Sequence, residues 1–221
     1  MNFQIVLGRI GSDIWANSRL RIIKQFVGPG RVLDLGCGKG YIGKSLNNEV
    51  IFGEINPEEF KDLESNKRTV LNALNLPFKS GYFDYVICSD MLEHIDDDVK
   101  VLAEIYRVLK EGGKAIIMVP AYQRLFGHHD IIMNHKRRYD KNTFRAKITH
   151  LDFDIAYNRY TCSLLFIPFL FNQLFVKSRK TYFGKSKLEH KILPLLNFIS
   201  LVESKIKLPL GIGLFYVLKK K

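Results

Sequence analysis

Three glycines with a carboxylate on either side are spaced for binding a ligand that carries an anionic group. Gly36, Gly38 and Gly40 alternate directly after the short apolar run 32–35. Glycine lets the backbone approach a ligand closely and adopt dihedral angles that other residues avoid. A helical stretch is expected from Tyr41, so free N–H groups at its start would face that ligand. The stretch therefore predicts a binding turn, and a tight turn without a ligand is the alternative.

Two acidic residues flank this turn. Asp34 precedes the glycines, and Glu54 lies about twenty residues beyond the first predicted strand. Doubly wound nucleotide-binding folds place an acidic side chain at that distance to bind the ribose hydroxyls. A carboxylate can accept two such hydrogen bonds. The alternative for Glu54 is a solvated residue that caps the turn before Asn56-Pro57.

A second group of reactive side chains follows the fifth predicted strand. Paired arginines suit a phosphate or carboxylate, and imidazoles can act as general bases. Two histidines and an aspartate could also suggest a metal site, but neither their spacing nor a second acidic ligand supports it, so no metal is expected. Solvated basic residues are the alternative for this loop. The group comprises His128, His129, Asp130, His135, Lys136, Arg137, Arg138 and Tyr139.

The elements that must position these side chains alternate between strand and helix. Apolar runs bounded by turn residues predict the strands, and apolar residues at helical spacing predict the helices. The pattern indicates a Rossmann-like, doubly wound α/β sheet of seven strands, mostly parallel, with an antiparallel last strand. The predicted strands are 32–35, 50–54, 68–71, 83–88, 115–119, 155–160 and 214–218, and helices are expected at 13–26 and 99–109.

One domain is expected, with a core at 13–160 and 208–221 and a hydrophobic and basic helical insertion at about 161–207. Residues 136–221 hold 18 Lys and Arg against 5 Asp and Glu, which accounts for the net charge of +12. An uncharged run at 160–176 is too short to span a bilayer, and basic residues follow it directly. This segment predicts either peripheral attachment to an anionic membrane or a buried lid or dimer contact.

The three cysteines form no CxxC pair, and residues 1–15 lack the pattern of a secretory signal. A cytoplasmic protein is therefore expected, with peripheral attachment at the inner membrane face as an option. Nucleic acid is not a favoured partner, because the aromatic residues are mixed into apolar runs rather than spread over a basic face. The oligomeric state is left open.

The motifs together resemble class I S-adenosylmethionine-dependent methyltransferases, in the broad branch that includes the quinone-biosynthesis enzymes. The resemblance rests on Asp34–Gly40, Asn72–Phe78, Phe83–Ile87, Leu92-Glu93-His94 and Leu109–Gly113. It departs from the family pattern at Glu54, where Asp is commoner, at Asn72, where an acid is usual, and at Glu111, where Pro is usual. The loop His135–Tyr139 is similar to the His-x-Arg-Arg-Tyr of a subset of bacterial and archaeal members.

The resemblance implies S-adenosylmethionine as cofactor and assigns roles to residues. His94 is either a base or a packing residue at a helix start. The cofactor-binding residues implied are Asp34, Gly36, Gly38, Gly40, Glu54, Asn72, Ala73 and Ser89. Position after the fifth strand makes His128, His129 and His135 the candidate catalytic bases, with Tyr122, Arg137, Arg138 and Tyr139 at the acceptor.

The leading hypothesis is methyl transfer to a small-molecule or lipid-linked acceptor, such as an isoprenoid quinone precursor or a polyprenyl-linked glycan, by in-line attack on the sulfonium methyl. An NAD-dependent oxidoreductase is the alternative enzyme, because Gly38, Gly40 and Gly43 fit the dinucleotide pattern. A non-catalytic module that binds membranes or RNA is the third hypothesis.

Overall fold

The computed structural model describes residues 12–65, 67–163, 166–167, 170, 198 and 201–221. The predicted insertion at 161–207, including most of its uncharged run and the basic residues that follow, lies largely outside this range. Within the described part of the chain, no helix has the length and apolar character needed to cross a membrane.

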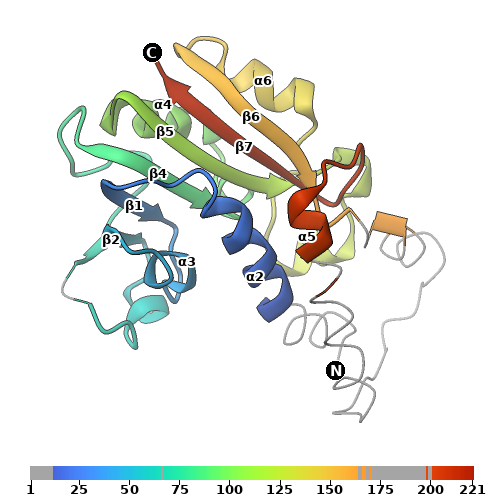
Figure 1. Cartoon of the computed structure of the whole chain (residues 1–221), viewed down its shortest axis with the longest axis horizontal. Helices are drawn as coiled ribbons and strands as arrows, with labels where there is room; N and C mark the ends of the chain where they lie inside the picture. Colours follow the sequence, from blue (N-terminus) through green and yellow to red (C-terminus); the bar gives the residue numbers. More distant parts are fainter. Residues whose placement is uncertain (1–11, 66, 164–165, 168–169, 171–197, 199–200) are drawn as a thin grey trace.

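Seven strands form one sheet in the order β3-β2-β1-β4-β5-β7-β6. Strands β1 to β5 run parallel to one another, and β7 enters antiparallel between β5 and β6. The predicted doubly wound sheet with an antiparallel last strand is therefore confirmed (Figure 1). The strands are β1 (Arg31–Leu35), β2 (Glu49–Glu54), β3 (Arg68–Val70), β4 (Phe83–Ser89), β5 (Leu109–Pro120), β6 (Phe153–Thr161) and β7 (Gly213–Lys220).

Helices cover both faces of this sheet (Figure 1). Strand β1 shows why both faces need cover: Val32 packs in one core cluster, while Leu33 and Leu35 pack in the other. The first cluster includes apolar residues of α2, and the second includes those of α4 and α6. The helices are α2 (Ser12–Ile23), α3 (Tyr41–Lys44), α4 (Asp98–Val108), α5 (His128–Ile132) and α6 (Lys141–Ile148).

Helix α4 shows how the sequence specifies an element. The Asp97 side chain caps its first turn by accepting a hydrogen bond from the Lys100 N–H at 3.0 Å. Four of its apolar residues fall on one face at helical spacing and are 0% exposed: Val101, Leu102, Ile105 and Val108. The helix ends at Val108, one residue before the predicted end, because Leu109 is already extended and begins β5.

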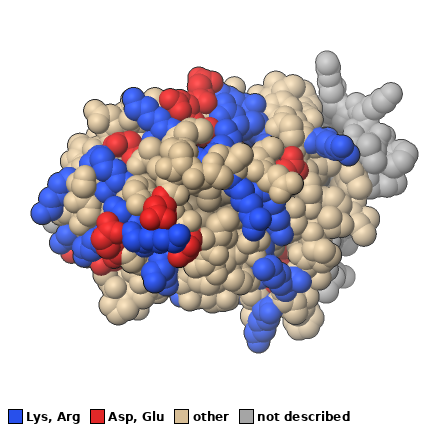
Figure 2. All heavy atoms as spheres, turned by 90° about the horizontal axis from the view of Figure 1, so that it is seen from above, with Lys and Arg blue, Asp and Glu red and all other residues tan. Residues whose placement is uncertain are grey.

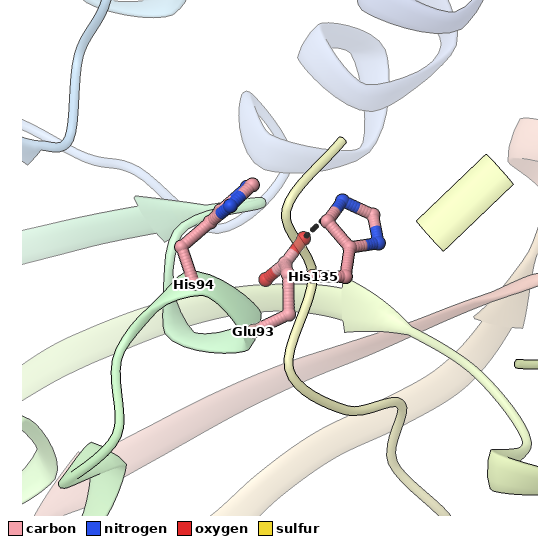
Figure 3. A group of neighbouring side chains, drawn as sticks. All are labelled: Glu93, His94 and His135. Carbon is pink, nitrogen blue, oxygen red and sulfur yellow. Dashed lines mark ion pairs between the residues drawn. The ribbon is translucent and has the colours of Figure 1, made fainter. Parts of the chain in front are cut away.

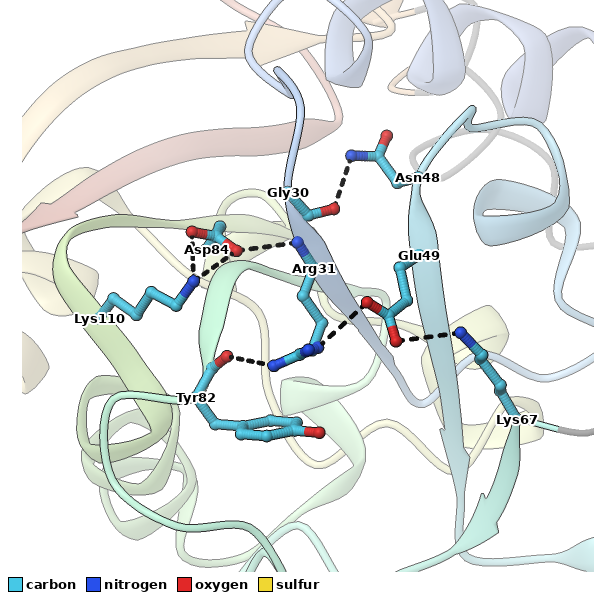
Figure 4. A network of polar contacts seen from close by, with 8 residues as sticks. All are labelled: Gly30, Arg31, Asn48, Glu49, Lys67, Tyr82, Asp84 and Lys110. Atoms are coloured by element: carbon cyan, nitrogen blue, oxygen red, sulfur yellow. Dashed lines mark hydrogen bonds and ion pairs between the residues drawn. The ribbon is translucent and has the colours of Figure 1, made fainter.

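A polar network ties the strands together at their amino ends (Figure 4). The Arg31 N–H of β1 donates to Asp84 of β4 at 2.8 Å, and Lys110 of β5 pairs with the same carboxylate. Glu49 of β2 accepts from Arg31 and from Lys67. This network stabilises the amino ends of the strands. The loops at the opposite, carboxyl ends are outside the network and can form a site.

Charged side chains are unevenly grouped on the surface. On the face shown in Figure 2, Lys and Arg stand in several separate groups, some with Asp or Glu beside them. Ion pairs such as Lys61–Glu58 and Lys67–Glu49 are exposed and contribute little to stability.

Candidate functional site: two adjoining cavities

The glycine turn after β1 has the backbone that only glycine adopts easily. Gly36, Gly38 and Gly40 have positive φ angles of 70°, 48° and 70°. A Cβ on Gly40 would meet Leu63 at 2.9 Å, whereas a Cβ on Gly38 would meet nothing within 4 Å. Gly40 is therefore required for packing, and Gly38 leaves open space for a ligand.

Asp34 acts within the fold. Its carboxylate accepts a hydrogen bond from the Gly43 N–H at 2.9 Å, and the residue is 3% exposed. Burial raises the pKa of Asp34 to about 7. The contact holds the short helix α3 against β1, so the turn between them keeps its shape.

Glu54, at the end of β2, lies across from the glycines. Its two carboxylate oxygens accept hydrogen bonds from the Gly38 N–H at 3.1 Å and the Ile55 N–H at 2.8 Å. Oε1 also accepts from the Asn56 N–H at 3.4 Å, whereas Oε2 retains a lone pair for a ligand hydroxyl. Glu54, which the sequence predicted to bind ribose hydroxyls, thus contacts the glycine turn directly.

A cavity of about 970 Å³ opens over the carboxyl ends of β1, β2 and β4. Five of the eight predicted cofactor residues line it: Gly36, Gly38, Glu54, Asn72 and Ala73. Asp34, Gly40 and Ser89 are outside the lining, where the first two shape the turn from behind.

At the end of β4, Asp90 lines the larger cavity in place of Ser89, which the sequence predicted there. Ser89 is the last residue of β4, and its hydroxyl contacts the Asp90 carboxylate at 3.2 Å. Asp90 has a φ of 52°, and this turn brings Asp90 and Met91 into the lining. The sequence analysis did not assign Asp90, although an acidic residue at the end of a predicted strand could have indicated it.

A second cavity of about 290 Å³ adjoins the first, and Asp90, His94 and Met133 line both. It lies at the carboxyl ends of β5 and β6 and the start of β7. The remaining walls come from residues far apart in the chain. They are Arg19, Glu93, Met118, Val119, Pro120, His129, His135, Arg138, Thr161, Cys162, Ile212 and Gly213.

The three predicted bases separate in the structure. His129 and His135 line the smaller cavity, whereas His128 is exposed and lines neither. The Nδ1 of His129 is buried without a hydrogen-bond partner among the described residues, and burial lowers the pKa of this imidazole. A neutral imidazole with a free nitrogen can accept a proton.

The four predicted acceptor residues also separate. Arg138 lines the smaller cavity. Arg137 pairs with Asp98 at 3.0 Å, and Tyr139, 1% exposed, donates its hydroxyl proton to the same residue at 2.8 Å. Tyr122 stacks on the Tyr160 ring at 5.1 Å. Asp98, the first residue of α4, is a buried acid that needs partners. Arg137 and Tyr139 provide them, and neither residue lines either cavity.

A buried chain of polar contacts runs from Arg138 to His135. Asp130 accepts from the Arg138 guanidinium at 2.8 Å and contacts the Nδ1 of His135 at 2.9 Å. Burial alone would raise the pKa of Asp130, but these hydrogen bonds hold it at about 2. The ionised carboxylate therefore fixes the Nδ1 of His135 as a proton donor and leaves its Nε2 directed elsewhere.

Glu93 belongs to the Leu92-Glu93-His94 motif, but the sequence assigned it no role. It is 1% exposed, and neither carboxylate oxygen has a hydrogen-bond partner among the described residues. Burial raises the pKa of Glu93 well above its usual value, and Asp90 raises it further. The Nε2 of His135 lies 3.9 Å from this carboxylate. His94 completes a group with Glu93 and His135 whose potential ligand atoms all lie within 4.8 Å of one another.

Residues 33–117 match the family description of a methyltransferase domain. An uncharacterised protein from Methanocaldococcus jannaschii is 32% identical over 144 residues, which cover 63% of this chain and 60% of that protein. A ubiquinone/menaquinone biosynthesis C-methyltransferase from Desulfotalea psychrophila is 33% identical over 102 residues, which cover 41% and 42% of the two chains. A solved S-adenosylmethionine-dependent methyltransferase from Thermotoga maritima superposes with a TM-score of 0.66 at 18% identity, covering 99% of this chain and 93% of that one.

Residues 33–117 are therefore similar to a methyltransferase domain, and the chain has the fold of solved S-adenosylmethionine-dependent methyltransferases. These solved proteins use S-adenosylmethionine as methyl donor. The chain spans 60% and 52% of the lengths of the first two curated relatives it matches. The similarity therefore concerns part of the chain, and the activity of the whole protein is a proposal.

The larger cavity fits this cofactor. Gly38 leaves open space where a side chain would otherwise project, and Glu54 offers carboxylate oxygens to ribose hydroxyls. Asn72 and Ala73, implied to lie at the adenine, line the same cavity.

Proposed function

We propose that this protein transfers the methyl group of S-adenosylmethionine to a small-molecule acceptor held in the 290 Å³ cavity. The observation that carries the proposal is the junction of the two cavities, where Asp90, His94 and Met133 line both. A donor in one cavity and an acceptor in the other would meet at this junction, and alignment is the main contribution of the protein to such a transfer.

The bound cofactor supplies an electrophilic methyl on a sulfonium, which passes to an acceptor lone pair while sulfur takes up the electrons of the broken carbon–sulfur bond. Glu54, Gly36 and Gly38 hold the donor. Arg138 lines the acceptor cavity and suits an acceptor that bears a carboxylate or phosphate. His129 takes the proton when the acceptor atom must lose one, because its buried Nδ1 is unpartnered.

A more specific version of this proposal is that the acceptor is lipid-linked. An isoprenoid quinone precursor is supported by similarity to a ubiquinone/menaquinone biosynthesis C-methyltransferase, over 41% of this chain. A glycan carried on a polyprenyl phosphate is supported by the basic loop. Both rest on the apolar and basic sequence of residues 160–191, most of which lies outside the described residues.

Calorimetric titration of the full chain with S-adenosylmethionine, S-adenosylhomocysteine and NAD tests the proposal. We expect the first two to bind with one site per chain and NAD to give no heat of binding. Formation of S-adenosylhomocysteine with a panel of phenols, carboxylic acids and amines then tests transfer. Binding of NAD in place of the adenosyl ligands would overturn the proposal in favour of the oxidoreductase alternative.

A further inference from the structure

Glu93, His94 and His135 meet at the wall of the smaller cavity and bring three potential metal ligands close together. Figure 3 shows the Glu93 carboxylate between the two imidazole rings. The three potential ligand atoms lie within 4.8 Å of one another, and their residues line the cavity. Two imidazoles and one carboxylate are a donor set that suits zinc and other first-row divalent ions, and suits magnesium and calcium poorly.

Within the described part of the chain, Glu93 lacks the close cationic partner that the neighbouring acids have. Asp90 pairs with Arg19, and Asp130 pairs with Arg138 at 2.8 Å. The Glu93 carboxylate is buried without a hydrogen-bond partner among the described residues, and its distance of 3.9 Å from the His135 Nε2 is too long for a hydrogen bond. A buried ionised carboxylate without a partner is costly, and either a proton or a bound cation removes that cost.

The surroundings orient the ligands as an outer shell of a metal site does. Asp130 holds the Nδ1 of His135, so the Nε2 lone pair faces Glu93. This arrangement is the carboxylate–histidine–metal relay found in many zinc proteins. The Lys136 N–H donates to the Glu93 carbonyl at 2.7 Å, which fixes the loop carrying His135 against the turn carrying Glu93.

We infer that Glu93, His94 and His135 bind one zinc-like divalent cation, with Asp130 as the positioning residue. Three protein ligands leave a further coordination position open, as in catalytic zinc sites. Because the three residues line the smaller cavity, this position would be available to a hydroxyl or carboxylate oxygen of the acceptor. This role at the acceptor rests on the proposed function, whereas metal binding itself does not. The sequence predicted no metal because the loop histidines alone lack the spacing of a metal site. No local pattern connects them with Glu93 and His94.

The test uses the full chain after chelator treatment and dialysis. Zn²⁺ is titrated against a chromophoric competitor, and Co²⁺ is added separately for its visible absorption. We expect one tight Zn²⁺ site per chain and Co²⁺ bands of a four- or five-coordinate centre. Glu93→Gln and His135→Ala should each weaken Zn²⁺ binding by at least 100-fold, and Asp130→Asn by about 10- to 100-fold. His150→Ala removes an exposed imidazole and should leave the affinity unchanged.

Two results would overturn the inference. One is a wild-type chain that takes up no stoichiometric Zn²⁺ or Co²⁺, which needs no variant to be folded. The other is a folded Glu93→Gln or His135→Ala chain with unchanged Zn²⁺ affinity. S-adenosylhomocysteine titrated into the same samples separates the two proposals. Adenosyl binding without metal binding refutes the metal site alone, and metal binding without adenosyl binding refutes the methyltransferase proposal alone.

Discussion

At the scale of single residues, Glu54 and Asp34 show that similar side chains serve different ends. Both carboxylates accept backbone N–H groups of the segment that follows β1. Glu54 lines the larger cavity, so its Oε2 is available to a ligand there. Asp34 is buried behind the turn. The first should therefore control binding and the second stability.

Replacing Glu54 by Ala should weaken S-adenosylhomocysteine binding by about 1.5–3 kcal/mol, the range for hydrogen bonds to a charged group. Calorimetry gives the affinity directly. Glu58→Ala is the matched control, because Glu58 is exposed, pairs with Lys61 and lies outside the cavity lining. An unchanged affinity in the Glu54 variant would remove this carboxylate from the ribose site.

Asp34 predicts a pH dependence of stability. Its ordinary pKa is 3.8 and its folded-state pKa is about 7, so between these values the folded chain keeps a proton that the unfolded chain has lost. Stability from this group therefore falls as pH rises from about 4 to 7, by at most about 4 kcal/mol, and is level above that range. Asn at this position can still accept the Gly43 N–H and cannot ionise.

Urea unfolding of the wild type and Asp34→Asn between pH 5 and 8 checks this. The variant should gain stability relative to the wild type as pH rises towards about 7. Parallel pH profiles for the two proteins would show that Asp34 ionises normally in the folded chain.

At the scale of elements, the glycine turn and the loop after β5 illustrate what a sequence can specify. The turn is local: glycines at alternate positions after an apolar run fix its conformation and its place, and the structure agrees. The loop is different, because burial of Asp98 forty-one residues away decides where Tyr139 points. Glu93 and His135 likewise come together only when the sheet has formed. Local patterns predicted the glycine turn, while such long-range polar partners could not be read from spacing.

Two alanine substitutions in the turn should have opposite consequences. Gly38 and Gly40 both have left-handed φ angles, so each alanine costs roughly 1–2 kcal/mol of backbone strain. A Cβ at Gly40 would also lie 2.9 Å from Leu63 and 3.1 Å from Phe52, whereas one at Gly38 would project into open space. Gly40→Ala should therefore lose more stability, and Gly38→Ala should lose more cofactor affinity.

Thermal unfolding and S-adenosylhomocysteine titration of both variants measure these two effects. Equal loss of stability in both, with cofactor affinity preserved in Gly38→Ala, would mean that the ligand does not pass over Gly38.

At the scale of the whole molecule, the sequence divides into a nearly neutral part and a basic part. The part through residue 135 supplies the lining of the larger cavity except Lys136, and the surplus of positive charge belongs to residues 136–221. Among the described residues of that second part, several large apolar side chains are exposed, including Ile167 at 75% and Phe198 at 62%. Apolar side chains among basic residues are typical of reversible attachment to an anionic membrane surface.

Flotation with vesicles tests this attachment. A basic residue near an anionic surface contributes about 1 kcal/mol, and salt screens it. We therefore expect the chain to float with anionic vesicles at low salt, to be released at high salt, and to ignore neutral vesicles. Replacing Lys177, Arg179 and Lys180 together by Gln should reduce flotation.

The matched control removes the same charge from the neutral part. Replacing Lys24, Lys44 and Lys61 by Gln should leave flotation intact, because these residues lie in the part without surplus charge. Absence of the wild type from anionic vesicles at low salt would refute membrane attachment and favour a lid or dimer contact. An equal loss of flotation in both triple variants would instead show that binding depends on net charge. The two variants have the same total charge, so only a localised basic surface would make them differ.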